Sequence, residues 1–336
     1  MPPSFYPRLI NGLFDDPGLL ITFQYEKRTV FFDLGDIHIL PAKDILKTSH
    51  VFITHTHMDH WIGFDRLIRL MLGREKTLYM YGPEGFLKNI EGKLTGYSWN
   101  LVQHYDRRFS ITATEIRSNY QETKHYSCHT GFLPGEPVQN RPFENILLKE
   151  SGLFVSTAIL DHIIPVLGYS LQERFHINIK TSAVAALNLE IGPWLNTFKH
   201  ALLNNEDPNS RFEVRFGKEN RRAETFVLGD LTEKIALITP GQKISYLADA
   251  VYNPSNEEKM VTLAEKADHL FIESAFLDKD REIAGEKYHL TAKQAGIIAG
   301  KARVKRFTLF HFSPRYQGQE HLIQNEATAA YNAYLG

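Results

Sequence analysis

One short segment, His55-Thr56-His57-Met58-Asp59-His60, concentrates three imidazoles and one carboxylate within six residues. It follows residues 51–54, whose apolar run predicts a short buried strand, so the segment should form a loop at a strand end. Imidazole and carboxylate ligands without thiolate suit zinc, manganese or iron. A structural zinc site would normally use cysteines, and the chain has only Cys128. The segment therefore predicts an open, catalytic metal site with solvent as a ligand.

Four ligands cannot complete two metal ions, so the remaining ligands must come from elsewhere in the chain. Three further polar residues each follow an apolar run, namely His162, Asp249 and His311. That position favours the rim of a sheet, where loops converge. Taken alone, Asp249 could instead cap the helix that follows it, and the two histidines could be satisfied core residues.

The elements that must position these residues can be read from hydrophobic periodicity. Strands are predicted over residues 19–25, 29–32, 51–54, 77–81, 109–116, 244–247, 270–272 and 307–310, and helices over 62–71, 84–93, 256–267, 291–302 and 319–333. The alternation in the C-terminal third implies a sheet with helices packed on its face. Residues 95–150 predict strands with long connections. No linker divides the chain, so we expect one domain over 1–336, with an inserted arm at about 174–230.

Charge and composition exclude several classes of protein. Across 336 residues, 38 Lys and Arg balance 39 Asp and Glu, which excludes a globally basic nucleic-acid binder but allows a local basic patch. The window 174–230 is nearly neutral, and we expect its Lys218, Arg221 and Arg222 to form a solvent-exposed face rather than an RNA-binding patch. No apolar stretch predicts a membrane span, and no signal peptide is evident. With a single cysteine, the chain is expected in the cytoplasm.

Several motifs carry a resemblance to a known family. The segment 54–60 resembles the signature of the metallo-β-lactamase fold. Later segments resemble the RNase Z family of tRNA 3′-processing endonucleases: Leu160-Asp161-His162 with Gly168-Tyr169-Ser170, Leu247-Ala248-Asp249, and His311-Phe312-Ser313-Pro314-Arg315-Tyr316. They occur in the family's order and cover nearly the whole chain. The resemblance implies an α/β (α+β) fold, an αββα sandwich of two mixed β-sheets flanked by helices.

The same resemblance implies roles for individual residues. Two zinc ions are expected, with manganese or iron possible in their place. His55, His57 and His162 would hold one ion, Asp59, His60 and His311 would hold the second, and Asp249 with a hydroxide would bridge them. Asp33 would brace the loop. The candidate catalytic residues are Asp59, His289 and Glu273: His289 would protonate the leaving ribose oxygen, and Glu273 would orient that histidine.

Some loops depart from the family's pattern, although no predicted ligand is lost. The family's GDT reads Ala248-Asp249-Ala250, and its HST reads His289-Leu290-Thr291. The leading prediction is hydrolysis of the 3′ trailer of precursor tRNA by a homodimer in which the arm of one subunit serves the other. One alternative is a hydrolase for a small phosphodiester such as a cyclic nucleotide. Another is a non-catalytic RNA-binding relative. His289 and Glu273 could also be purely structural.

Overall fold

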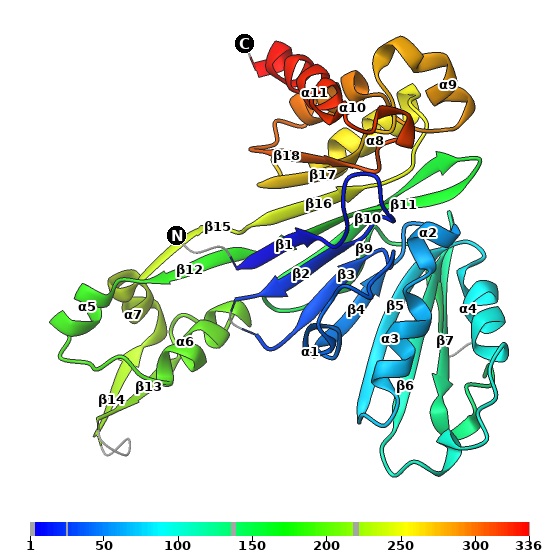
Figure 1. Cartoon of the computed structure of the whole chain (residues 1–336). Coiled ribbons are helices and arrows are strands. Elements are labelled where there is room, and N and C mark those ends of the chain that lie inside the picture. Colours follow the sequence, from blue (N-terminus) through cyan, green and yellow to red (C-terminus); the bar gives the residue numbers. More distant parts are fainter. Residues whose placement is uncertain (1–3, 25, 136–138, 218–221, 336) are drawn as a thin grey trace. The chain divides into compact units, whose positions relative to one another are not determined.

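The computed structural model describes residues 4–24, 26–135, 139–217 and 222–335, and two large sheets dominate it (Figure 1). One sheet has eight strands in chain order: β1 (Phe5–Leu9), β2 (Leu19–Phe23), β3 (Thr29–Phe32), β4 (Thr48–Phe52), β5 (Lys76–Pro83), β6 (Phe109–Ile116), β7 (Tyr120–Ser127) and β8 (Gln139–Pro142). It is mixed, because β3 to β6 run parallel and the flanking pairs run antiparallel.

The second sheet has six strands in the order β18 (Phe307–Phe310), β17 (His269–Glu273), β16 (Lys243–Leu247), β11 (Ile164–Glu173), β10 (Leu153–His162) and β9 (Ile146–Lys149). Strands β16, β17 and β18 are parallel, so their carboxyl ends meet at one edge of the sheet. Ile163 alone joins β10 to β11. These strand ends are where the candidate ligands were predicted.

An aromatic layer joins the inner faces of the two sheets. Phe32 of β3 stacks on Tyr169 of β11 with ring centroids 5.5 Å apart, and lies 5.8 Å from the ring of Tyr246 on β16. Side chains alternate between the faces of a strand, so the neighbouring Phe31 enters the core on the other side of the sheet. The predicted residues 29–32 thus supply both faces of the sheet.

Helices cover the outer face of each sheet (Figure 1). The short α1 (Ala42–Ile45) and α2 (Met58–Trp61) accompany α3 (Phe64–Met71) and α4 (Phe86–Thr95), and their apolar residues share a core with β4, β5 and β6. The second core joins β16 to β18 with α8 (Pro254–Ala264), α10 (Ala292–Lys301) and α11 (Glu320–Leu335), next to α9 (Arg281–Glu286). The predicted αββα fold class is confirmed.

Element bounds differ from prediction where tertiary contacts intervene. The predicted helix 62–71 begins only at Phe64, as α3, and the segment 55–60, predicted as a loop, ends in the short helix α2 instead. Ile62 and Gly63 lie between the two helices. A Cβ on Gly63 would lie 2.4 Å from the carbonyl oxygen of Gly35, so the chains approach too closely there for a larger residue. The predicted helix 84–93 begins only at Phe86, because β5 stays paired with β6 through Pro83. The predicted strand 19–25 ends at Phe23, and Tyr25 lies outside the described residues.

Residues 148–154 and 172–242 form a second compact unit, which we call unit 2. It contains the ribbon β12 (Phe175–Ile179) with β15 (Ala236–Pro240), the hairpin β13 (Arg211–Phe216) with β14 (Arg222–Val227), and helices α5 (Thr181–Ala186), α6 (Trp194–Leu203) and α7 (Leu228–Ile235). Phe198 and Leu231 are fully buried in its core, beside Trp194. Lys218 and Arg221 lie outside the described residues. The predicted arm boundaries, 174–230, stay a prediction.

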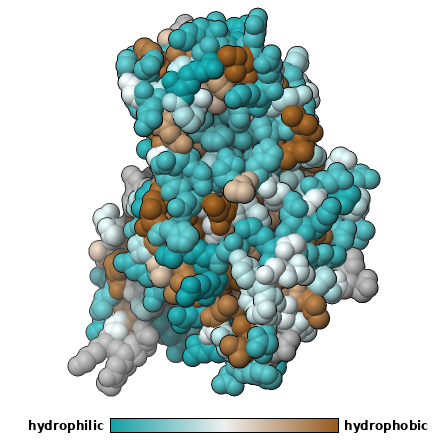
Figure 2. Space-filling view, turned by 45° about the vertical axis from the view of Figure 1, so that its right-hand side comes forward, coloured by the Kyte–Doolittle hydropathy of each residue, from teal (hydrophilic) through white to brown (hydrophobic). Residues whose placement is uncertain are grey.

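The surface is mostly polar on the face drawn in Figure 2, where apolar side chains form separate patches among hydrophilic ones. Within the described ranges, no helix combines the length and the apolar character that crossing a membrane requires.

Candidate metal centre

The predicted ligands converge from strand ends of both large sheets. His55 and His57 follow β4, and Asp59 and His60 lie in α2 directly after them. His162 ends β10, while Asp249 and His311 follow the parallel strands β16 and β18, which lie on either side of β17. Residues spread over more than 250 positions of the chain are thereby brought to one site.

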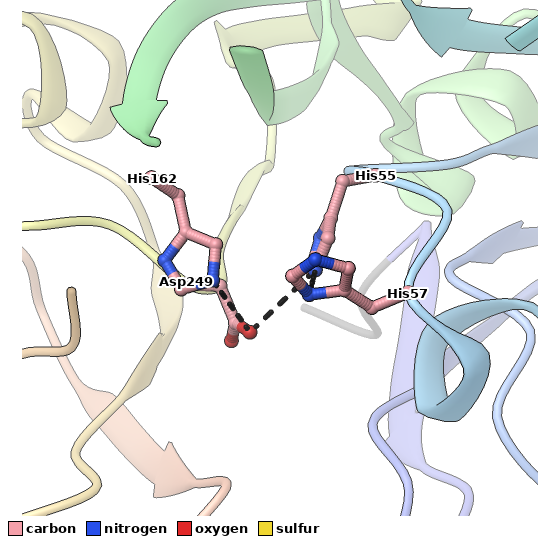
Figure 3. A group of neighbouring side chains, drawn as sticks. All are labelled: His55, His57, His162 and Asp249. Atoms are coloured by element: carbon pink, nitrogen blue, oxygen red, sulfur yellow. Dashed lines mark hydrogen bonds and ion pairs between the residues drawn. The ribbon is translucent and has the colours of Figure 1, made fainter. Parts of the chain in front are cut away.

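The first group consists of His55, His57, His162 and Asp249, which offer ligand atoms within 4.8 Å of one another (Figure 3). The Nε2 atom of His55 lies 2.8 Å from Nδ1 of His57. Asp249 Oδ2 lies 3.7 Å from His55 Nε2 and 3.8 Å from His162 Nε2. The nitrogens and the carboxylate oxygen thus face a common point.

The second group consists of Asp59, His60 and His311. Asp59 Oδ2 lies 3.3 Å from His311 Nε2 and 3.5 Å from His60 Nε2. The structure therefore brings together the same two triads that the resemblance to the RNase Z family implied, although their role as ligands stays a prediction.

Asp249 lies between the two groups. Its Oδ2 is 3.4 Å from His60 Nε2 and also faces the first group, while its Oδ1 is 2.9 Å from His311 Nδ1. The alternative in which Asp249 caps the next helix is wrong, because Asn253 caps α8 by accepting a hydrogen bond from the backbone N–H of Asn256. The position of Asp249 suits a carboxylate that contacts two cations.

A set of outer contacts aims the imidazoles at Asp249. The Nδ1–H of His60 donates to Asp33 Oδ2 at 2.8 Å, and that of His162 donates to the backbone carbonyl of Tyr288 at 2.8 Å. His55 Nδ1 lies 3.1 Å from Thr54 Oγ1. With Nδ1 engaged in each ring, Nε2 is left to face the centre, as is usual for histidines that bind metals.

Asp33 carries much of this outer layer, as predicted for a bracing residue. It is fully buried, and it accepts hydrogen bonds from the Thr54 backbone N–H at 2.7 Å and from the Thr54 hydroxyl at 2.8 Å. The Tyr246 hydroxyl donates to Asp33 Oδ2 at 3.1 Å. The sequence analysis did not identify Thr54 and Tyr246 as hydrogen-bond partners of Asp33. Thr54 directly precedes the histidine segment, whereas nothing in the sequence distinguishes Tyr246 from a core tyrosine.

Burial and neighbouring charges shift the pKa values of the site residues in different directions. Burial lowers the pKa of His55 to about 2, which keeps this imidazole neutral and able to bind a metal. Burial also opposes protonation of His311, but Asp249 outweighs it and raises the pKa of His311 to about 10. Burial favours the neutral form of Asp249, yet the adjacent His311 and His60 hold its pKa well below the ordinary range.

The backbone is strained at several of these positions. Asp33, Asp249 and His311 adopt left-handed conformations with φ of 59°, 45° and 60°. Ile163 and Tyr288, which flank the site, have φ of 65° and 58°. Such conformations cost about 1–3 kcal/mol each in non-glycine residues and cluster at functional sites. The fold therefore holds these side chains where local preference alone would not.

The donor set fits a divalent cation. Among the described residues, His60 Nε2, Asp249 Oδ1 and His311 Nδ1 belong to the buried side-chain atoms that make no well-aligned hydrogen bond, although the last two form an ion pair at 2.9 Å. Buried polar atoms are nearly always satisfied, so orphaned atoms that face one another need a cause. A metal ion supplies one, because imidazole and carboxylate suit zinc, manganese or iron.

His289 and Glu273 form a pair beside the centre. His289 Nδ1 lies 2.9 Å from Glu273 Oε2, and Glu273 Oε1 accepts a hydrogen bond from the Ala250 backbone N–H at 2.8 Å. Burial lowers the pKa of His289, but the charge of Glu273 outweighs it and raises that pKa overall. A cavity of about 240 Å³ opens here, and its lining includes Asp59, His289 and His311. A phosphate in this cavity would contact both the centre and His289.

Comparisons with known proteins agree with this geometry. The chain is 30% identical to the ribonuclease Z of Thermobifida fusca over 289 residues, which cover 84% of this chain and 71% of the relative. It is 27% identical to the ribonuclease Z of Bacillus subtilis over 317 residues, which cover 90% and 84%. It is 26% identical to that of Deinococcus radiodurans over 279 residues, which cover 83% and 80%. No protein-family model matches the chain.

Solved structures support the fold. The metallo-beta-lactamase fold protein YhfI from Bacillus subtilis superposes with a TM-score of 0.52 at 14% identity, covering 98% of this chain and 91% of that one. The short form of human tRNase Z superposes with a TM-score of 0.51 at 19% identity, covering 94% and 91%. Together with the sequence relatives, this fold places the chain in the ribonuclease Z family of metal-dependent hydrolases with the metallo-β-lactamase fold.

Proposed function

We propose that this chain is a zinc-dependent endoribonuclease that hydrolyses a phosphodiester bond, with the 3′ trailer of precursor tRNA as its leading substrate. The observation that carries the proposal is the position of Asp249 between two groups of imidazoles, with the Glu273–His289 pair beside it. The relatives named ribonuclease Z support RNA as the substrate class.

Two zinc ions would divide the ligands as the resemblance to the RNase Z family implies. His55, His57 and His162 would hold one ion, Asp59, His60 and His311 would hold the other, and Asp249 would contact both. When bound, such ions lower the pKa of a water molecule and neutralise charge on the phosphate oxygens.

The chain's own residues would then move the protons. Asp59 lines the cavity and would accept a proton from the attacking water as the new P–O bond forms. Glu273 holds Nδ1 of His289, which leaves Nε2 to donate its proton to the leaving O3′ as the P–O3′ bond breaks. The products would be an RNA with a 3′-hydroxyl and a trailer with a 5′-phosphate.

We also propose that unit 2 acts as an RNA-binding arm and that the chain works as a homodimer. Unit 2 has its own buried core, so it can present a defined surface, and Arg211 and Arg215 on β13 are exposed there. Phosphate contacts dominate RNA affinity, so a nearly neutral arm should bind less tightly than a basic one. That charge is the observation that favours the second candidate, a hydrolase for a small phosphodiester.

The test is cleavage of a 3′-extended precursor tRNA by zinc-loaded protein, with the cut position mapped and His57→Ala as the control. A single cut after the discriminator nucleotide, absent in the variant, is expected. If the protein holds about two metals and hydrolyses bis-p-nitrophenyl phosphate but leaves the precursor intact, the tRNA proposal fails. The small-diester candidate then replaces it.

A further inference from the structure

His289 lines two cavities. The first, of about 240 Å³, contains Asp59 and His311 in its lining. The second, of about 350 Å³, is lined by Val251, Tyr252, Arg281, Lys293 and Gln294 as well as by His289. None of the predicted metal ligands lines this second cavity, so the metal centre does not account for it.

The second cavity carries two fixed cations. Arg281 donates from Nε to Asp278 Oδ1 at 3.0 Å and from Nη2 to Oδ2 at 2.7 Å. Lys293 Nζ donates to the same Asp278 Oδ2 at 3.4 Å. Both cationic side chains remain half exposed, whereas Asp278 is largely covered. The lining thus has one net positive charge and free donors, which suits a phosphate group.

The rest of the lining suits a ribose and a base. Tyr252 donates its hydroxyl to Glu257 Oε1 at 2.8 Å, so its ring is held in place at the cavity wall. Aromatic rings of this kind provide sequence-tolerant stacking for nucleobases. A Cβ on Gly285 would meet nothing within 4 Å, so the cavity stays open there. The volume is within the usual range for small-ligand sites.

The proposed reaction determines on which side of His289 the nucleotide with the leaving oxygen must lie. A general acid must be within hydrogen-bond reach of the oxygen that it protonates. If His289 protonates the leaving O3′, the nucleotide that carries this oxygen lies against His289, on the side away from the metal centre. The second cavity fits this requirement, because its lining includes His289 but none of the predicted metal ligands.

We propose that the second cavity is the subsite for the nucleotide immediately upstream of the scissile bond. Arg281 and Lys293 contact the phosphate on the 5′ side of that nucleotide, and Tyr252 packs against its base. This assignment rests on the proposed function, because it uses His289 as the donor to O3′. A small diester without an upstream phosphate would not use the two cations.

The test compares Arg281→Gln, Lys293→Gln and the double variant with Lys47→Gln. Lys47 is a matched control, since it is about as exposed as Lys293 and pairs with a carboxylate, Asp44, at 3.3 Å, but does not line the cavity. For the double variant, KM on the 3′-extended RNA should rise at least tenfold more than KM on bis-p-nitrophenyl phosphate. The salt dependence of RNA binding should also weaken, by about 0.7 in log–log slope per lost phosphate contact. Lys47→Gln should change neither value.

A binding measurement separates the subsite from the cleavage reaction. Fluorescence anisotropy with a labelled single-stranded RNA that ends in a 3′-hydroxyl reports the subsite even if the wild type cuts no RNA. Weaker binding by the double variant alone would keep the subsite while the tRNA proposal falls. Unchanged RNA binding and unchanged KM, or equal losses on both substrates, would overturn the subsite. Thermal unfolding of each variant shows whether Arg281 and Lys293 serve only to neutralise Asp278.

Discussion

The Asp33→Asn substitution tests how the outer layer controls the metal centre. Asp33 faces two donors that are fixed in place, the Thr54 backbone N–H at 2.7 Å and the His60 Nδ1–H at 2.8 Å. An asparagine of the same size has only one acceptor oxygen. Either orientation of its amide therefore points an NH₂ group at one of the two donors.

The expected magnitude follows from this conflict. If the NH₂ group faces Thr54, a buried backbone donor loses its partner, which costs about 1–3 kcal/mol of stability. If it faces His60, that ring relieves the conflict by moving its proton to Nε2, the atom that should bind metal. Substitution of such outer partners costs about 10- to 100-fold in metal affinity. We expect a loss in this range at the site that contains His60.

The assay is competition for zinc between the protein and a chromogenic chelator, combined with long-range ¹⁵N–¹H correlation spectra that report histidine tautomers. Asp36→Asn is the matched control, since Asp36 also contacts a histidine Nδ1, that of His38, at 2.8 Å, but on the exposed surface. Asp36→Asn should change stability by no more than about 0.5 kcal/mol. If Asp33→Asn keeps wild-type zinc affinity and the wild-type His60 tautomer, the reasoning about the outer layer is refuted.

Three further predictions follow from the packing and the site. His162→Ala should lower bound metal by about one ion per chain, as measured by elemental analysis, and unchanged content would remove this residue from the ligand set. Gly296→Ala should destabilise the protein by about 1–3 kcal/mol, because the new Cβ would lie too close to the Ala327 carbonyl oxygen on α11. Urea titration measures this loss, and Gly285→Ala, whose new Cβ would meet nothing within 4 Å, should show no such loss. Phe198→Ala should cost unit 2 about 3–5 kcal/mol while hydrolysis of a small diester persists, and a matching loss of that hydrolysis would contradict an independent core.

Much of the site could be predicted from sequence, because ligand chemistry and strand ends are local properties. The segment from His55 to His60 has its donor types within six residues, and the strands before Asp249 and His311 are visible as apolar runs. The resemblance to the RNase Z family added the grouping of the ligands, and the structure brings the same triads together. The strands over 29–32, 109–116 and 307–310 were predicted with the observed bounds, since each is a continuous β-prone run.

Other features depend on contacts between distant parts of the chain. An acidic residue between a strand and a helix has the same local pattern whether it caps the helix or lies between two cations, so the sequence alone left Asp249 ambiguous. The structure removes the capping alternative because Asn253 occupies the cap. Likewise, the pattern over 62–71 predicted a helix from Ile62, whereas the helix begins at Phe64, directly after the close approach of Gly63 to Gly35.

Residue type and short-range periodicity were enough to predict the set of donors, their order and the strands that end at them. The orientation of the donors, in contrast, depends on tertiary contacts. Tyr246 meets Asp33 across 213 residues, and Tyr288 meets His162 across 126. Such contacts arise from the packing of two sheets, and no local pattern encodes the distance or the left-handed backbone that they require.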